Sequence, residues 1–354
     1  MAAASRRVGL AKLRLKTARR TPRLRFARGS VVLPRLRRGE TSPKAKPRTC
    51  IGGDGGLWRC LGAAALAVAL GGCTVNVNTD GATASETHTF TVTGTPKVAL
   101  DTFDGSIEVH AWDRSEVEVV VEKQAQDEAK LQEITVEKSQ DGDQVTLRVR
   151  GPASSGSDGI VIGVHYSPSA RLRVAVPRAT MLDLRSGDGS ITVEEITGTA
   201  SLRTDDGAIV ASRLSGEVLA RTDDGSIRFR EMTGKIDVET GDGSVVVGGT
   251  LTHLRAKTGD GSVRVAVEPG SRVEEDWTVE TRDGSVEVRL PETVDVVVDA
   301  VTSDGSIRSN YPGLTVERGD DDEDRSRREL RGTLGAGGRT LRIRSGDGTI
   351  RFER

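Results

Sequence analysis

The chain of 354 residues contains 42 Gly but only 3% aromatic residues. Aromatic side chains supply much of the buried area in large enzyme cores, so this composition argues against an ordinary large enzyme. The formal net charge of −1 hides an uneven distribution, because residues 1–72 hold 17 of the 51 Lys and Arg but only 2 of the 52 Asp and Glu. Residues 73–354 are left with 34 basic and 50 acidic residues, and this acidic excess disfavours nucleic-acid binding.

The first 73 residues indicate export. Residues 1–56 are a basic, proline-containing leader that we expect to be disordered, unless translation starts near Leu57 and omits it. Residues 57–73 have the form of a signal peptide, with an apolar run at 61–70 that is too short to span a bilayer. The run ends in Leu-Gly-Gly-Cys at 70–73, which resembles the lipobox of bacterial lipoproteins. The resemblance implies that Cys73 is lipidated and anchors the chain to a membrane, whereas a buried helix with an incidental cysteine is the alternative.

Thr74 after the cysteine is compatible with sorting to the outer membrane of a two-membrane bacterium, and residues 74–88 are polar enough to be a tether. Cys50, Cys60 and Cys73 are the three cysteines of the sequence. No disulfide framework is therefore expected in the residues that follow.

An 18-residue repeat dominates the second half of the sequence. Asp-Gly, a small residue and a β-branched residue recur with glycines at 189, 207, 225, 243 and 261, and again at 284, 305 and 348. We interpret the later, wider spacings as coils with insertions, the last being two coils plus seven residues. Apolar residues alternate on both sides of each Asp-Gly turn, as at Leu182, Leu184, Ile191 and Val193. This pattern predicts two short strands per repeat, each with one buried face.

Two architectures satisfy the repeat. A β-solenoid, similar to a parallel β-helix, would stack 18-residue coils and close their apolar columns on one another, whereas an antiparallel meander would leave one face uncovered. We favour the solenoid for residues 179–354. In either case glycine is expected at the Asp-Gly turn, and at a second turn near Gly198, Gly216 and Gly234, because turn residues often need a positive φ. Residues 89–178 contain less regular strands and a short helix near 124–131, and we expect them to cap the stack.

Stacked coils would align one aspartate per turn. Neighbouring carboxylates about 4.8 Å apart repel by roughly 0.9 kcal/mol in water, so the row needs compensation. Backbone N–H groups of each turn, and basic residues three positions earlier such as Arg185 and Arg203, would supply it. Calcium bridging between coils is the alternative, and it would use Asp188, Asp206, Asp224, Asp242 and Asp260 as ligands.

Two aromatic residues lie where the repeat is irregular. Trp277 falls in the insertion between Gly261 and Gly284, and Tyr311 follows the Gly305 turn. Aromatic side chains on loops are suited to stacking against sugars or proteins, and packing over a coil edge is the alternative.

Gly-Asp-Gly-Ser-Ile repeats behind a lipobox, from the strand at 103–112 to the terminal LRIRSGDGTIRF at 341–352, resemble a bacterial β-strand-repeat family of unknown function whose members are named as candidate adhesins. The resemblance covers roughly residues 89–354. It implies a β-solenoid at the cell envelope and a role in attachment, but it supplies no catalytic or binding residues.

The sequence therefore predicts an envelope lipoprotein with a non-catalytic ectodomain that acts as an adhesin, scaffold or surface sensor. Its partners would be a membrane, through the lipid anchor, and an envelope glycan or surface protein. No resident cofactor is expected. The four histidines, at 88, 110, 165 and 253, lack metal-ligand spacing, and the sequence has no G-x-S-x-G, P-loop or H-E-x-x-H motif. A carbohydrate-active β-helix enzyme that uses carboxylates is the alternative.

Overall fold

The computed structural model describes residues 74–78, 81–152, 167–318 and 327–354. Twenty-four strands and one short helix, α1 (Glu128–Gln132), are found in these residues, and all the strands belong to one hydrogen-bonded network. The expected all-β class is therefore confirmed for the described part of the chain.

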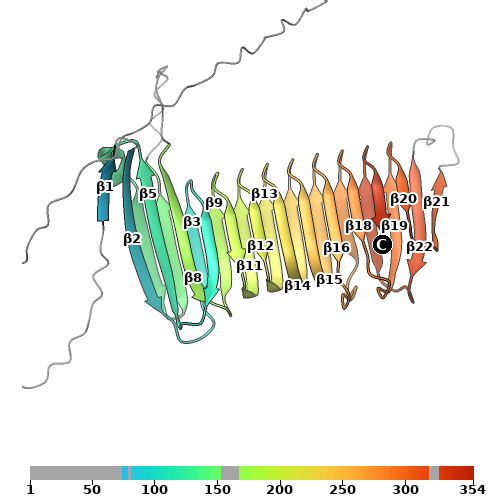
Figure 1. Cartoon of the computed structure of the whole chain (residues 1–354), viewed down its shortest axis with the longest axis horizontal. Coiled ribbons are helices and arrows are strands. Elements are labelled where there is room, and N and C mark those ends of the chain that lie inside the picture. The colour runs from blue at the N-terminus through green and yellow to red at the C-terminus, as the bar shows by residue number, and fades with distance from the viewer. Residues whose placement is uncertain (1–73, 79–80, 153–166, 319–326) are drawn as a thin grey trace, which may run out of the picture. The chain divides into compact units, whose positions relative to one another are not determined.

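The regular middle of the chain is a stack of rungs, each made of one strand before an Asp-Gly turn and one strand after it (Figure 1). Corresponding strands of successive rungs pair in parallel, exactly one repeat apart, as Ile191 pairs with Ile209 and Leu182 with Ala200. This parallel register excludes the antiparallel meander in the repeat and makes the fold β-solenoid-like. The strands of this part are β9 (Met181–Ser186), β10 (Ile191–Glu194), β11 (Thr197–Thr204), β12 (Ile209–Ser212), β13 (Ser215–Thr222), β14 (Ile227–Thr240), β15 (Val245–Thr258), β16 (Val263–Val267), β17 (Trp277–Thr281) and β18 (Val286–Arg289).

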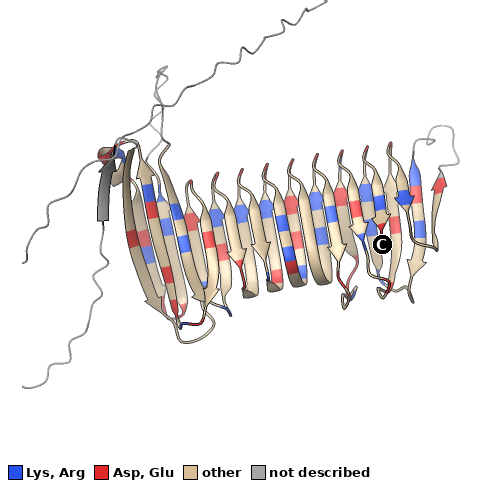
Figure 2. Cartoon of the chain, in the orientation of Figure 1, with Lys and Arg blue, Asp and Glu red and all other residues tan. Residues whose placement is uncertain are grey.

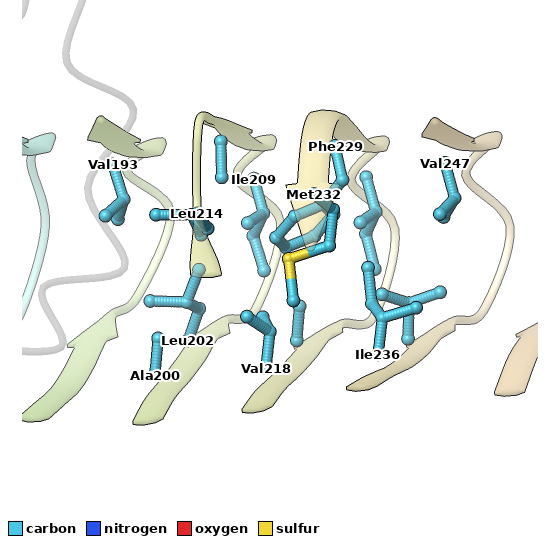
Figure 3. Packing of buried hydrophobic residues seen from close by; sticks show 14 of the residues in the cluster. Val193, Ala200, Leu202, Ile209, Leu214, Val218, Phe229, Met232, Ile236 and Val247 are labelled. Carbon is cyan, nitrogen blue, oxygen red and sulfur yellow. The ribbon is translucent and has the colours of Figure 1, made fainter. Parts of the chain in front are cut away.

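Apolar side chains fill the space between the two strand rows. The alternating residues that the sequence assigned to the interior are buried in every rung, and Figure 3 shows Ala200, Leu202 and Ile209 among them. A small residue compensates for a large one within a column, since Ala211 lies beside Phe229 in the paired strands β12 and β14. The interior is therefore filled mainly by aliphatic side chains, which explains the low aromatic content.

The glycine of each Asp-Gly turn is required for close approach between rungs. A Cβ atom built on Gly225 would overlap the carbonyl oxygen of Gly207 in the preceding rung, and the same holds along the row. Positive φ is not the reason, because among the turn glycines only Gly105 has one. The expected left-handed conformation belongs instead to the second glycine row, where Gly216 has φ 131°.

A buried hydroxyl accompanies each of these glycines. Thr222 Oγ1 accepts a hydrogen bond from Gly225 N at 3.1 Å and lies 3.0 and 3.1 Å from the carbonyl oxygens of Asp205 and Gly207 in the preceding rung. A buried threonine or serine stands three positions before each turn glycine. Ser186, Thr204, Thr240, Thr281, Thr302 and Ser345 likewise accept a hydrogen bond from the glycine N–H of their own turn, a role that the repeat pattern had not suggested. The buried row comprises Thr102, Ser186, Thr204, Thr222, Thr240, Thr258, Thr281, Ser345 and Thr302.

At the N-terminal end, chain order and stacking order differ. The rung of β3 (Lys97–Thr102) and β4 (Ile107–Trp112) lies between the β9–β10 rung and the rung formed by β7 (Gln144–Arg150) and β8 (Ser169–Pro177). Antiparallel strands then complete both rows, β6 (Thr135–Asp141) on β7, and β5 (Glu116–Ala125), β2 (Gly81–Thr91) and β1 (Thr74–Asn78) on β8. These antiparallel strands lie at the N-terminal end of both strand rows, whereas β3, β4, β7 and β8, which were expected in the cap, pair in parallel and are rungs of the stack.

Three expectations for this end need correction or lie outside the structure. Residues 74–78 and 81–88 are not a tether, because they belong to the paired strands β1 and β2. The helix begins at 128 rather than 124. The leader, the signal peptide and Cys73 lie outside the described residues.

The C-terminal end corrects the expected order of coils. The last rung in sequence, β23 (Thr340–Ser345) and β24 (Ile350–Glu353), is inserted between the β17–β18 rung and the rung of β19 (Val296–Thr302) and β20 (Ile307–Ser309). The interval between Gly305 and Gly348 does not hold two coils. Between β20 and β23, its described residues form an antiparallel pair, β21 (Leu314–Arg318) and β22 (Arg328–Leu334), that extends the row beyond β19.

Replacing Gly225 by Ala tests the close approach of the rungs. The added methyl group must displace the backbone of the preceding rung, so we expect a loss of about 2–3 kcal/mol in unfolding free energy, as for other overpacked sites. Chemical denaturation measures it. Ala208→Ser is the matched control, since other rungs carry serine in that row. Equal stability of the two variants would contradict the assignment of Gly225 to a rung-to-rung contact.

Candidate functional site

The five predicted aspartates lie in one row at exposed turns. Asp188, Asp206, Asp224, Asp242 and Asp260 are all exposed, and the strand register places them on successive rungs. The row extends to Asp104, which the register of β4 with β10 places beside Asp188.

Mutual repulsion in this row affects proton binding. Partial desolvation raises the pKa of Asp206, and the neighbouring charges of Asp188 and Asp224 raise it further. The charge compensation that the sequence suggested is not the one observed. The turn glycine N–H groups donate to the buried hydroxyls and not to the aspartates. Arg185 and Lys257 pair with Asp183 and Glu239 instead of the turn aspartates.

Calcium bridging stays a hypothesis for this row. In the described ranges, no group of three or more His, Cys, Asp or Glu side chains is arranged to hold a metal ion. Asp260 is in addition engaged by Arg282 of the following rung, with Nη2 2.7 Å from Oδ1.

Trp277 and Tyr311 do not stand on exposed loops. Trp277 is the first residue of β17 and is fully buried, and its indole N–H donates to the carbonyl of Thr252 at 3.3 Å. Tyr311 is 6% exposed, and its hydroxyl oxygen lies 2.6 Å from the carbonyl oxygen of Leu290 and 2.5 Å from that of Glu353. Both side chains therefore serve packing, which contradicts their expected role as stacking groups for a ligand.

An open groove with a volume of about 890 Å³ lies beside the Asp-Gly turns. One side of the groove is formed by the last outward-facing side chain of each strand that leads into an Asp-Gly turn. The other side is formed by the residue directly before the Asp-Gly pair of each turn. Asp205 and Asp223 stand in the turn row, followed by Gly241, Gly259 and Arg282. The strand row contains Arg203, Arg221, Glu239, Lys257, Glu280 and Arg344.

Ion pairs fix part of this groove. Glu239 lies 3.2 Å from Lys257 Nζ and 3.9 Å from Arg221 Nε, and the hydrogen bond from Lys257 lowers the pKa of Glu239. Arg203 has no ion-pair partner within the part of the chain that the structure describes, and its neighbours on the adjacent rungs are Arg185 and Arg221. The sequence pattern suggested the arginines only as counter-charges, and the groove was not predicted because it is formed by side chains from several successive rungs. Figure 2 shows the charged residues as bands that continue across neighbouring strands.

A second polar cluster joins the two strand rows at the N-terminal cap. Lys138 Nζ of β6 donates to His88 Nδ1 of β2 at 2.9 Å, and His88 Nε2 lies 3.2 Å from Glu86 Oε2. Glu86 also pairs with Lys123 of β5. Burial lowers the pKa of His88, and the adjacent Lys138 charge lowers it further. A neutral imidazole can accept the hydrogen bond from Lys138 at Nδ1, and its Nε2 then lies near the Glu86 carboxylate.

The one helix in the described ranges is far too short to cross a membrane.

Acidification is expected to weaken the cap through His88. The pKa of the unfolded chain at this residue is near 6.5 and that of the folded protein is lower, so the unfolded state binds the proton first. The unfolding free energy should therefore fall as the pH drops below about 6.5 towards 5.5. Urea titrations at both pH values measure the change, and His88→Gln should reduce it. An identical pH dependence in the variant would exclude His88 as the cause.

Comparison with known proteins places the chain in a family. The model of the Toastrack DUF4097 family matches residues 95–353. Among solved structures, the chain is similar to a candidate cell adhesion protein from Clostridium sporogenes, at 14% identity over 76% of this chain and 97% of that one, with a TM-score of 0.26. A candidate adhesin from Bacteroides fragilis and a candidate lipid-binding protein from Parabacteroides distasonis each show 10% identity over 76% of this chain and 97% of theirs, with TM-scores of 0.35 and 0.39.

A search of curated proteins found no match. The family match covers well over half of the sequence and includes the whole repeat. The chain therefore belongs to the Toastrack DUF4097 family.

Proposed function

We propose that this protein is a lipoprotein of the bacterial cell envelope, anchored through Cys73, whose β-solenoid ectodomain is a non-catalytic adhesion or scaffold module. Its ligand would be an envelope glycan held along the groove beside the Asp-Gly turns. The observation that carries the proposal is the alignment of charged side chains from successive rungs along one open groove.

The chemistry of the groove suits a hydroxyl-rich polymer. Guanidinium groups donate several hydrogen bonds in a fixed plane and carboxylates accept them, so together they match the donors and acceptors of sugar hydroxyls. Arg203, Asp205 and Asp223 are groove residues without an ion-pair partner among the described residues, and they are available for such contacts. Because the rungs repeat, a linear polymer would meet a charged side chain at each step and gain avidity from weak individual contacts.

The electrostatics support binding over hydrolysis. A glycosidase needs one carboxylic acid whose raised pKa keeps it protonated near neutral pH, beside a second carboxylate. Glu239 in the middle of the groove has a lowered pKa because Lys257 donates to it. It is therefore suited to staying ionised in a fixed ion pair.

The position of β1 supports an anchor with little slack. Thr74, the residue that follows Cys73, is already paired with Ser85 of β2. A lipidated Cys73 would therefore hold the N-terminal cap close to the membrane surface, since a chain spans at most about 3.6 Å per residue. Two or more acyl chains on one cysteine make such attachment stable.

Binding of the purified protein to isolated envelope and glycan fractions, with calcium and then with chelator, tests the proposal. We expect saturable glycan binding that Arg203→Gln weakens about tenfold, since a hydrogen bond from a charged group contributes about 1.5–3 kcal/mol. Arg228→Gln is the matched control, because Arg228 is exposed on β14 outside the groove. Cys73→Ser should release the protein from the membrane fraction without altering glycan binding.

The outcomes separate the parts of the proposal. Equal affinity of the two arginine variants would reject the groove, and no binding in either buffer would reject glycan adhesion. Saturable binding to envelope protein alone would favour a surface protein as the partner. Loss of binding in chelator would show that the aspartate row needs calcium.

A further inference from the structure

The C-terminal rung occupies a slot between two rungs that precede it in the sequence. β23 pairs in parallel with β17 on one side and β19 on the other, and β24 pairs likewise with β18 and β20. Leu341, Ile343 and Ile350 of this rung are fully buried. Removing residues 340–354 would therefore expose two strand edges on each side and an apolar cavity between them.

The slot also recognises polar groups of the inserted rung. Ser345 Oγ donates to the carbonyl of Gly284 at 3.1 Å, and Arg344 pairs with Asp299 of β19 at 2.7 Å. On the other side, Thr302 Oγ1 lies 3.1 Å from the carbonyl oxygen of Gly348. These contacts require a hydroxyl residue three positions before a glycine turn, so the slot selects a segment with this chain's own repeat pattern.

A short connection of residues 335–339 leads into this rung. It passes from β22 on one side of β19 to β23 on the other, over the start of β19, where Ala336 N donates to Asp295 Oδ1 at 2.6 Å. Gly335, Gly337 and Gly338 have φ of 58°, 77° and 120°. Short hinges of this kind favour exchange of the following element between copies, because an extended hinge avoids the tight crossover.

We propose that the slot is an assembly site and that two copies of this chain dimerise by exchanging residues 340–354. A second copy supplies the same strands, hydroxyl and arginine, so every contact of the closed monomer is reproduced in the dimer. The proposal goes beyond adhesion and does not depend on glycan binding.

Disulfide trapping between copies tests the exchange. Thr278 of β17 and Arg342 of β23 are paired residues on adjacent parallel strands, a spacing that a disulfide can bridge. In full-length chains with Cys50, Cys60 and Cys73 replaced by serine, Thr278→Cys is made in one copy and Arg342→Cys in the other. The two are refolded together at high concentration and oxidised. Exchange predicts a mixed disulfide dimer on non-reducing gels.

Matched controls decide the result. Thr192→Cys mixed with Val210→Cys probes an equally paired site on interior rungs, and should give at least tenfold less mixed dimer. A single chain carrying both Thr278→Cys and Arg342→Cys should close internally at low concentration. A terminal pair that crosslinks between copies no more than the interior pair would overturn the proposal. Failure of the double variant to close would also overturn it, by removing the register on which it rests.

Discussion

The stack depends on the contact between one turn and the next. At each Asp-Gly turn the backbone of one rung lies against the carbonyl groups of the preceding rung, at a distance that leaves no room for a Cβ atom. A buried hydroxyl completes the contact, because Thr222 accepts from the glycine N–H of its own turn and faces two carbonyl oxygens of the rung before. An unsatisfied buried polar group would cost about 1–3 kcal/mol at each rung, so the hydroxyl and the glycine are required together.

Exact register between rungs has consequences for both faces of the strands. On the inner face it superposes apolar residues into continuous columns. On the outer face it places residues from the same repeat position side by side, whatever their charge. This register makes neighbours of Arg185, Arg203 and Arg221. On the next two rungs the same position holds Glu239 and Lys257, which form an ion pair with each other. The same register aligns the residues of successive rungs that line the groove. The feature that stabilises the fold thus also determines the surface on which we place glycan binding.

The 18-residue spacing predicted the strands of residues 181–267 and their buried faces. It left parallel stacking and an antiparallel meander both open, and the parallel stack was favoured only because it closes the apolar columns. The hydroxyl three positions before each glycine was visible in the sequence, at Ser186 and Thr204 for example, but the turn glycines were explained by φ and the hydroxyl was overlooked. The order of the rungs at the two ends was not predictable from the repeat, because an inserted rung and an adjacent one have the same apolar pattern. Trp277 and Tyr311 lie where the repeat is irregular, so the repeat pattern did not predict their burial.

The measurement that tests the central claim most directly is the stability of Thr222→Val against Thr222→Ser. Valine keeps the shape of threonine but leaves Gly225 N without its acceptor, whereas serine keeps the hydroxyl. Denaturant titration should show valine destabilising the protein by about 1–3 kcal/mol and serine by distinctly less. If valine is as stable as the natural threonine, the hydroxyl row does not hold the rungs together, and apolar packing alone determines their register.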